Sequence, residues 1–250
     1  GKPASAMETI GKAQNRRGTS IRFHPDAQIF GEDARFAAAR LFKMTRSKAY
    51  LFGGVEIRWS CDESLATPEV PAKASFHFPG GLKDFLGARI EGEPKIVDEI
   101  FAGTVGKPGS NGAVEWAIAW CLGDGFLNSY CNTIPTAEGG THEQGLRVAL
   151  LRGLRNYGDL SGNKRAAQIT ADDVLVQCSA MLSVFVREPE FVGQTKDKLS
   201  SAEATRIVDN ALRDAFDHWL AASPNQAGKL LDWTIERAEE RLRRKKEKEV

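Results

Sequence analysis

The sequence lacks the features that mark several large classes of protein. No apolar run approaches the roughly 20 residues that a membrane-spanning helix needs. None of the four cysteines forms a Cys-x-x-Cys pair, and their spacing is irregular. With no signal peptide, they indicate reduced, packed thiols in a cytoplasmic protein. The formal net charge is +1, so any attraction to nucleic acid must be local, and no membrane partner is expected.

What is present is an ordinary globular composition. The 250 residues include 42% hydrophobic and 27% charged residues, enough for one large domain or one domain with extensions. The chain starts at Gly1 with a flexible lead and stops at Val250 inside a charged helical pattern. We therefore expect an excised segment of something larger.

Periodicity predicts an α+β fold, because strands, hairpins and helices are intermixed. Alternating patterns predict strands at residues 18–24, 55–59, 74–78, 113–120, 126–133 and 177–186. The second and third strands are expected to pair, Asp124-Gly125 is expected to join the fourth and fifth in a hairpin, and the last strand is expected to be central. Helical spacing predicts helices at residues 33–48, 82–90, 141–157, 171–175, 200–222 and from 224 onward.

Two of these helices carry start signals. Thr141 is expected to cap the helix that follows it. Ser200 and Glu203 form a capping-box pattern ahead of the longest amphipathic stretch.

Metal and phosphate motifs are weak. His142-Glu143 begins like a zinc-protease helix, but Leu146 stands where the second histidine is needed, so no metal site is expected. Gly139-Gly140 before a helix would suit a phosphate, yet no Lys-Ser/Thr pair follows. A glycine turn followed by a threonine cap is the favoured interpretation.

Basic residues gather near the C-terminal end, interspersed with glutamates. A solvated helix face outweighs contact with a nucleic-acid backbone as their explanation. The cations are Arg241, Arg243, Arg244, Lys245, Lys246 and Lys248.

A short polar loop holds Gln194 and Lys196 between the last predicted strand and the long helix. On composition alone, a loop lysine is usually just solvated. Three segments around it change this expectation. They are residues 18–26 (GTSIRFHPD), 132–147 (NTIPTAEGGTHEQGLR) and 194–201 (QTKDKLSS).

In order along the chain, these segments resemble the transducer domain of bacterial type II DNA topoisomerases, and the last resembles its QTK loop. The context of residues 134–136 and 193–196 is closer to the B subunit of topoisomerase IV than to that of gyrase. The resemblance implies a ribosomal-protein domain-2-like (GHMP-kinase-like) transducer fold, with a mixed sheet followed by two long C-terminal helices. It also implies a lead at residues 1–17, a transducer domain at 18–222 and a helix at 223–250 that leads toward an absent TOPRIM domain.

The resemblance implies a mechanism as well. A preceding ATPase domain of the GHKL type would hold ATP and Mg²⁺ in the full-length protein. Lys196 would act as a catalytic cation and Gln194 as a hydrogen-bond donor, both contacting the terminal phosphate. The expected partners are DNA, the topoisomerase IV A subunit and a second copy of the B subunit, acting in decatenation during chromosome segregation.

This chain by itself is expected to be inactive and to hold no cofactor or metal. It has no Asp-x-Gly-x-Gly nucleotide loop, no Glu-Gly-Asp-Ser start of a TOPRIM domain and no DNA-cleaving tyrosine region. The loop at 194–198 is then expected to be exposed and mobile.

Two alternatives stay open besides the gyrase B subunit. One is a stand-alone nucleic-acid-binding module of the ribosomal type, which would use the basic C-terminal helix together with Arg147, Arg152 and Arg155. The other is a small-molecule kinase of the related fold, but the phosphate loop that such an enzyme needs is missing.

Overall fold

The computed structural model describes residues 2–15 and 17–248, whose contacts fall into two units, Gly1–Ala37 and Ala38–Val250. The first unit contains one short helix, α1 (Ala27–Phe30), and an edge-to-face contact between Phe23 and Phe36 with ring centroids 5.7 Å apart. The strand predicted at residues 18–24 is not formed, and that prediction was wrong. Ile21 is 80% exposed and Phe23 71% exposed, so the alternating pattern has no partner strand or core to pack against.

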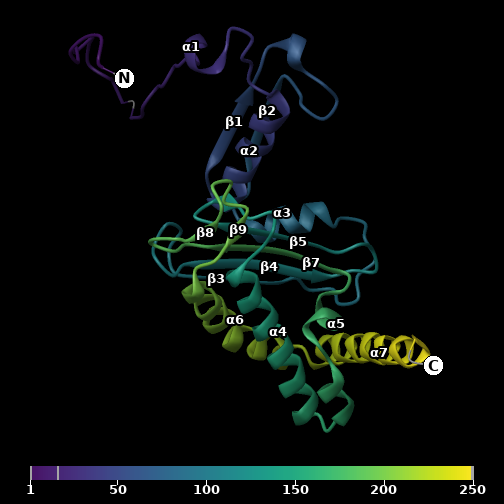
Figure 1. Cartoon of the computed structure of the whole chain (residues 1–250). Helices are drawn as coiled ribbons and strands as arrows, with labels where there is room; N and C mark the ends of the chain where they lie inside the picture. The colour runs from purple at the N-terminus through teal and green to yellow at the C-terminus, as the bar shows by residue number, and fades with distance from the viewer. Residues whose placement is uncertain (1, 16, 249–250) are drawn as a thin grey trace. The chain divides into compact units, whose positions relative to one another are not determined.

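The second unit is built on a mixed five-stranded sheet (Figure 1). The central strand pairs in parallel with one neighbour, and the remaining pairs are antiparallel. In spatial order the strands are β3 (Phe101–Val105), β4 (Val114–Trp120), β7 (Cys178–Val184), β5 (Phe126–Cys131) and β6 (Ile134–Pro135). The prediction of a central strand at residues 177–186 is confirmed.

The predicted hairpin between residues 113–120 and 126–133 was wrong. Strand β7 lies between β4 and β5, and both of them bond to β7 instead of to each other. A Cβ on Gly125 would lie 2.7 Å from the backbone nitrogen of Cys178. Glycine at residue 125 thus allows β7 to approach closely. The turn-like composition of Asp124-Gly125 led to the wrong prediction of a hairpin.

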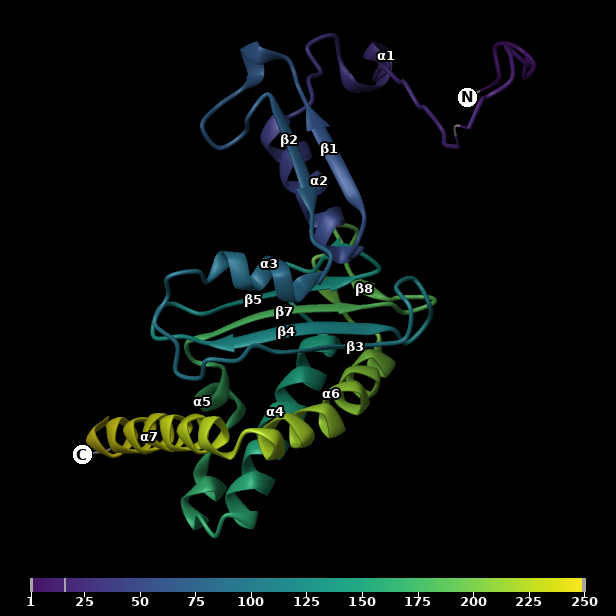
Figure 2. The same ribbon diagram turned by 180° about the vertical axis from the view of Figure 1, so that it is seen from behind.

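Both faces of the sheet are buried, and alternation along β4 divides its side chains between two clusters. Trp116, Ile118 and Trp120 enter a large cluster with the C-terminal helices, while Ala117 and Ala119 face the smaller cluster around α3 (Leu82–Arg89). Figure 2 shows α3 on one face of the sheet, with α4 (Thr141–Leu160) and α6 (Ala202–Ala222) on the other.

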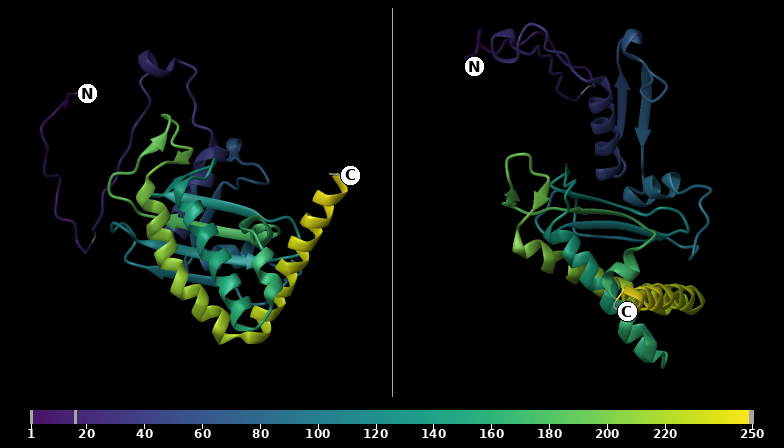
Figure 3. Two further views of the ribbon diagram at one scale, coloured as in Figure 1. Left: turned by 60° about the horizontal axis from the view of Figure 1, so that its bottom comes forward. Right: turned by 45° about the vertical axis from the view of Figure 1, so that its right-hand side comes forward.

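Helices α4 and α6 lie side by side because small residues line their contact (Figure 3). A Cβ on Gly145 would lie 2.9 Å from Cβ of Val208, and one on Gly153 would lie 3.0 Å from Cε1 of Phe216. Val208, Leu212, Phe216 and Leu220, which the sequence places on one helical face, are all 0–1% exposed.

Five further elements lie in the described part of the C-terminal half. Helix α7 (Pro224–Lys248) follows α6 and packs against η2 (Lys164–Gln168) and α5 (Ala171–Leu175). A small hairpin, β8 (Phe191–Val192) with β9 (Lys198–Leu199), precedes α6.

Helix α2 (Ala38–Leu51) packs on the hairpin of β1 (Glu56–Ser60) and β2 (Lys73–His77), with a short 3₁₀ turn, η1 (Glu63–Leu65), between the strands. The predicted pairing of these two strands is confirmed. Nζ of Lys48 donates to the carbonyl oxygen of Thr133 at 2.8 Å and to its Oγ1 at 2.7 Å, which ties α2 to the turn between β5 and β6. In the part of the chain that the structure describes, no helix is both long and apolar enough to cross a membrane.

Candidate functional site

The loop at residues 193–197 joins β8 to β9 and forms the tip of their hairpin (Figure 1). The strands pair through Phe191 with Leu199 and Val192 with Lys198. Two residues of the loop lie in the left-handed region of backbone space, Gly193 at φ 75° and Lys196 at φ 60°. For a lysine this conformation costs about 1–2 kcal/mol, so the surrounding contacts must hold it.

The first of these contacts is a turn at residues 136–140, which lies directly beside β9. The amide of Glu138 donates to the carbonyl oxygen of Asp197 at 2.8 Å, and the amide of Leu199 donates to the carbonyl oxygen of Gly139 at 3.0 Å. A Cβ on Gly140 would overlap the carbonyl oxygen of Leu199. Glycine is therefore needed at residue 140 for the hairpin to dock, which is a more specific role than the glycine turn that the sequence indicates.

The second contact is with the start of α6. The amide of Ser200 donates to the carbonyl oxygen of Glu190 at 2.8 Å, and the amide of Glu190 donates to Oγ of Ser201 at 2.7 Å. Ser201, not Ser200, is the N-cap of α6, and its side chain makes no cap hydrogen bond. The predicted capping box of Ser200 and Glu203 is thus wrong, because the serine hydroxyl beside the helix is used to hold the hairpin.

Beneath the turn lies a set of buried polar side chains from three elements. His142 and Glu143 belong to the first turn of α4, Ser129 to β5, and Thr136 follows β6. Thr136 Oγ1 lies 2.9 Å from His142 Nε2 and 2.6 Å from Ser129 Oγ, and Ser129 Oγ donates to Glu143 Oε1 at 2.6 Å. Sequence reasoning gave these residues no shared role. The prediction that Thr141 caps α4 was wrong, because Gly140 occupies the N-cap position and Thr141 is the first residue of the helix.

Burial decides the protonation states in this cluster. His142 is 0% exposed, and desolvation lowers its pKa to about 4, so its imidazole is neutral at pH 7. Desolvation raises the pKa of Glu143, while the hydrogen bond from Ser129 and the charge of Arg147 oppose that rise. Other elements do not bring metal ligands to residues 142–146 in the described structure. Among the residues that the structure describes, no group of three or more His, Cys, Asp or Glu side chains could hold a metal ion.

Gln194 and Lys196 are both exposed at the hairpin tip, as predicted from the sequence. Nζ of Lys196 lies 5.8 Å from the ring centroid of Phe191, within cation–π range. Within the described residues, Lys196 forms no ion pair with a carboxylate. The tip thus exposes a cation and an amide to solvent. Its mobility and the phosphate-contacting roles of both residues stay predictions.

The three arginines of α4 that could have served a nucleic-acid surface are already engaged. Arg147 pairs with Asp172, Arg152 pairs with Asp209, and Arg155 donates to the carbonyl oxygen of Ile169. On α7, Arg241 is likewise held by a bidentate ion pair with Asp173 at 2.9 Å. These contacts connect α4 to α5 and α6, and α7 to α5, so they weaken the alternative of a stand-alone nucleic-acid-binding module.

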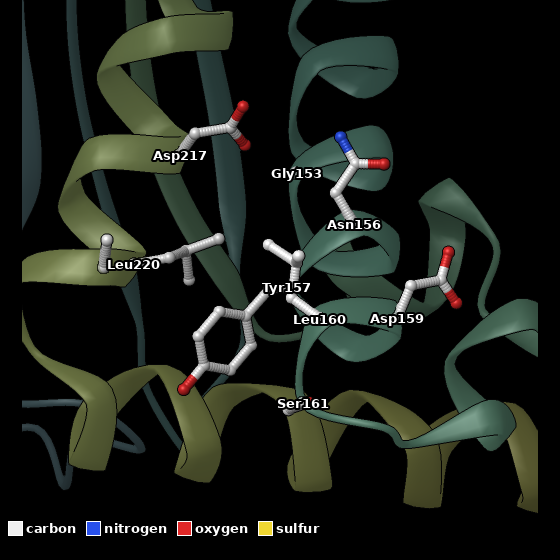
Figure 4. A pocket seen from close by; sticks show the side chains of 9 residues that line it. Gly153, Asn156, Tyr157, Asp159, Leu160, Ser161, Asp217 and Leu220 are labelled. Carbon is white, nitrogen blue, oxygen red and sulfur yellow. The ribbon is translucent and has the colours of Figure 1, made fainter.

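A hollow of about 570 Å³ lies between the C-terminal ends of α4 and α6 (Figure 4). Leu160 and Leu220 give it an apolar surface, and the carboxylates of Asp159 and Asp217 stand at its sides. The nine residues that line it include no lysine or arginine, so it does not suit a phosphate. The hairpin tip is the better candidate for an anion contact.

Comparison with known proteins gives these features a family context. Residues 81–250 match the family model of DNA gyrase B. The chain is 55% identical over 252 aligned residues to the B subunit of DNA topoisomerase 4 from Bartonella bacilliformis, an alignment that covers 100% of this chain and 36% of that protein. It is 34% identical to the protein of that name from Salmonella typhimurium, covering 97% of this chain and 38% of that one. The chain therefore spans about a third of the length of the curated relatives that it matches.

Two solved structures align over most of the chain. The 43K ATPase domain of Thermus thermophilus gyrase B is 27% identical with a TM-score of 0.72, covering 90% of this chain and 59% of that one. The topoisomerase IV ATP-binding domain of Francisella tularensis is 28% identical with a TM-score of 0.67, covering 86% and 57%.

These structures correct the predicted fold assignment. The sequence interpretation set the chain apart from an ATPase domain as a ribosomal-protein domain-2-like transducer, whereas the structures that it matches are ATPase and ATP-binding domains. The transducer assignment rested on the resemblance of three short segments. The structural match instead extends over 90% of this chain and covers 59% of the Thermus thermophilus ATPase domain. By fold, the chain is similar to part of these two domains.

The matched family model covers more than half of the chain, and relatives from several bacteria align along nearly all of it. The chain belongs to the DNA gyrase B family.

Proposed function

We propose that the chain is part of the ATPase region of a topoisomerase IV B subunit, and that Lys196 and Gln194 contact the terminal phosphate of ATP from the tip of the β8–β9 hairpin. The observation that carries the proposal is an exposed lysine, without an ion pair among the described residues, held in a strained conformation on a hairpin whose base is fixed. A point cation with an amide two residues away suits a terminal phosphate oxygen.

ATP and Mg²⁺ would be held mainly by the remainder of the ATPase region. The chain covers 59% of the Thermus thermophilus domain, which leaves room for a nucleotide pocket in the rest. Lys196 would stabilise the charge that develops on the phosphate during transfer to water, and Gln194 would fix the orientation of that phosphate. After phosphate release the contact would be lost, so the hairpin would report the nucleotide state to α6.

In the full-length protein we place this ATPase cycle in DNA strand passage and decatenation. The partners would be DNA, the topoisomerase IV A subunit and a second copy of the B subunit, and the compartment would be the bacterial cytoplasm. The identity of 55% to a topoisomerase 4 relative over the whole chain supports this branch. A gyrase B subunit is the alternative. Decatenation without introduction of negative supercoils, measured with the co-purifying A subunit, separates the two.

The test of the phosphate contact is ATP turnover by the complete ATPase region. Lys196→Ala should lower kcat by roughly 10²- to 10³-fold, as does loss of a single charge-stabilising donor in other active sites. Gln194→Ala should lower it by about tenfold, the value of one hydrogen bond. The matched control is Lys107→Ala, which removes the same charge from another exposed loop. Equal turnover in the Lys196 and Lys107 variants would rule out the assigned role.

A further inference from the structure

The buried side chains of Ser129, Thr136, His142 and Glu143 form one continuous chain of hydrogen bonds below the hairpin. We propose that this chain of hydrogen bonds sets the position of the 193–197 loop, with Thr136 as the positioning residue that connects the hydrogen bonds to the hairpin. The inference rests on the proposed phosphate contact of Lys196 and adds a device that holds this lysine in place.

The direction of the hydrogen bonds follows from counting protons. Ser129 has one hydroxyl proton, which it donates to the carboxylate of Glu143 at 2.6 Å. The single hydroxyl proton of Thr136 is then directed at Ser129, whose carbonyl oxygen lies 2.9 Å and whose Oγ lies 2.6 Å from Thr136 Oγ1. His142 must therefore donate from Nε2 to Thr136 Oγ1 at 2.9 Å, which leaves its Nδ1 unprotonated. Nδ1 is also the ring nitrogen that has no hydrogen-bond partner within the described part of the chain, which is consistent with this tautomer.

This series of hydrogen bonds ends at the turn of residues 136–140, against which the hairpin docks. The amide of Thr136 donates to the carbonyl oxygen of Ser129 at 2.9 Å, and the carbonyl oxygen of Thr136 accepts from the amide of Gly139 at 2.9 Å. Gly139 in turn accepts from Leu199, so Thr136 lies two hydrogen bonds away from β9. A shift of Thr136 would therefore move the acceptor that fixes the C-terminal side of the loop.

Position, not burial alone, is what the cluster contributes. Thr136 is 3% exposed and His142 is 0% exposed, so apolar side chains of similar volume would fill the same space. Such residues would not specify one arrangement of α4, β5 and the turn, whereas a hydrogen-bonded chain with a single direction does. The loop needs such a support because Lys196 holds a strained left-handed conformation.

The experiment compares three variants of the complete ATPase region. Thr136→Val removes the hydroxyl, Thr136→Ser restores it, and Thr234→Val is the matched control. Thr234 is 0% exposed, and its Oγ1 donates at 2.7 Å to the carbonyl oxygen of Leu230 within α7. Thr136→Val should lower kcat by about tenfold, while Thr136→Ser and Thr234→Val should stay close to the original value. In a Lys196→Ala background, Thr136→Val should cause no further loss, because both changes act on one contact.

Two measurements judge the positioning without using turnover. Hydrogen exchange at the amides of Glu138 and Leu199 should become about tenfold faster in Thr136→Val but not in Thr234→Val. The ¹⁵N shifts of His142 should report the Nε2-protonated tautomer in the unaltered protein and a changed environment in Thr136→Val. If Thr136→Val does not fold, Ser129→Ala interrupts the same chain and takes its place.

The outcomes separate this inference from the proposed function. Unchanged exchange at both amides, or turnover losses that add to those of Lys196→Ala, would overturn the positioning role. Should Lys196→Ala leave turnover intact, the proposed function fails, and the exchange and ¹⁵N measurements still decide whether Thr136 positions the loop.

Discussion

Docking of the β8–β9 hairpin depends on the absence of a side chain at residue 140, and Gly140→Ala tests this directly. Gly140 has φ 140° and ψ −157°, a region that only glycine readily adopts. An added Cβ would lie 2.7 Å from the backbone nitrogen of Leu199 and would overlap its carbonyl oxygen. The change therefore combines backbone strain with a clash that moves β9 away.

The cost can be estimated from what is lost. Strain of this kind costs on the order of 1–3 kcal/mol, and each of the two backbone hydrogen bonds between the turn and β9 contributes about 1 kcal/mol. We expect Gly140→Ala to lower the free energy of unfolding by roughly 3 kcal/mol. Urea unfolding measures this loss, and hydrogen exchange at Leu199 shows whether the hairpin has come away.

Gly162→Ala is the matched control. Gly162 also has a positive φ, 73°, but an added Cβ would meet nothing within 4 Å. It should therefore lose only the strain, about 1 kcal/mol. Equal destabilisation by Gly140→Ala and Gly162→Ala, with unchanged exchange at Leu199, would show that hairpin docking does not depend on Gly140.

Two further predictions concern the core. Because His142 has a pKa of about 4 when folded and about 6.5 when unfolded, the unfolded state binds more protons between these values. Stability should thus fall as the pH drops from 6.5 to 4, and His142→Gln should flatten this part of the curve in urea unfolding at several pH values; an equal slope in both proteins would argue against a buried neutral imidazole. Gly153→Ala should destabilise by about 1–3 kcal/mol, because the added methyl group would push Phe216 and α6 away from α4. Gly228→Ala, in an open helical position on α7, should instead stabilise by up to about 1 kcal/mol, and thermal unfolding that ranked the two variants alike would contradict the close packing.

The elements of this fold that the sequence could predict are those with a strong period. The four apolar residues of α6 at i+4 steps are buried as expected, and the β1–β2 hairpin pairs as expected. Pairing in the main sheet could not be predicted, because alternation identifies a strand without naming its neighbours. Strand β3 was missed altogether. Gly103 interrupts its pattern, and that glycine is required because a Cβ there would lie 2.8 Å from Cη2 of Trp116.

The site was predictable in a similar, partial way. The exposure of Lys196 and Gln194 followed from a polar loop between two apolar elements. The buried hydrogen-bonded side chains below the hairpin could not be predicted, since residues 129, 136 and 142 come together only when β5, the turn and α4 are folded. A lone histidine gives no signal of burial in the sequence. The glycine pair at 139–140 was visible, but the carbonyl oxygen of Leu199 that excludes a side chain there was not.

The central claim is that Lys196 touches the terminal phosphate of ATP, and chemical labelling of this amine tests it most directly. The complete ATPase region would be acylated with a lysine-specific reagent and the labelled sites counted by mass spectrometry, with Lys107 as the internal reference. A non-hydrolysable ATP analogue should protect Lys196 strongly and ADP should not, while Lys107 is labelled alike throughout. Equal labelling of Lys196 with the ATP analogue and with ADP would contradict the account.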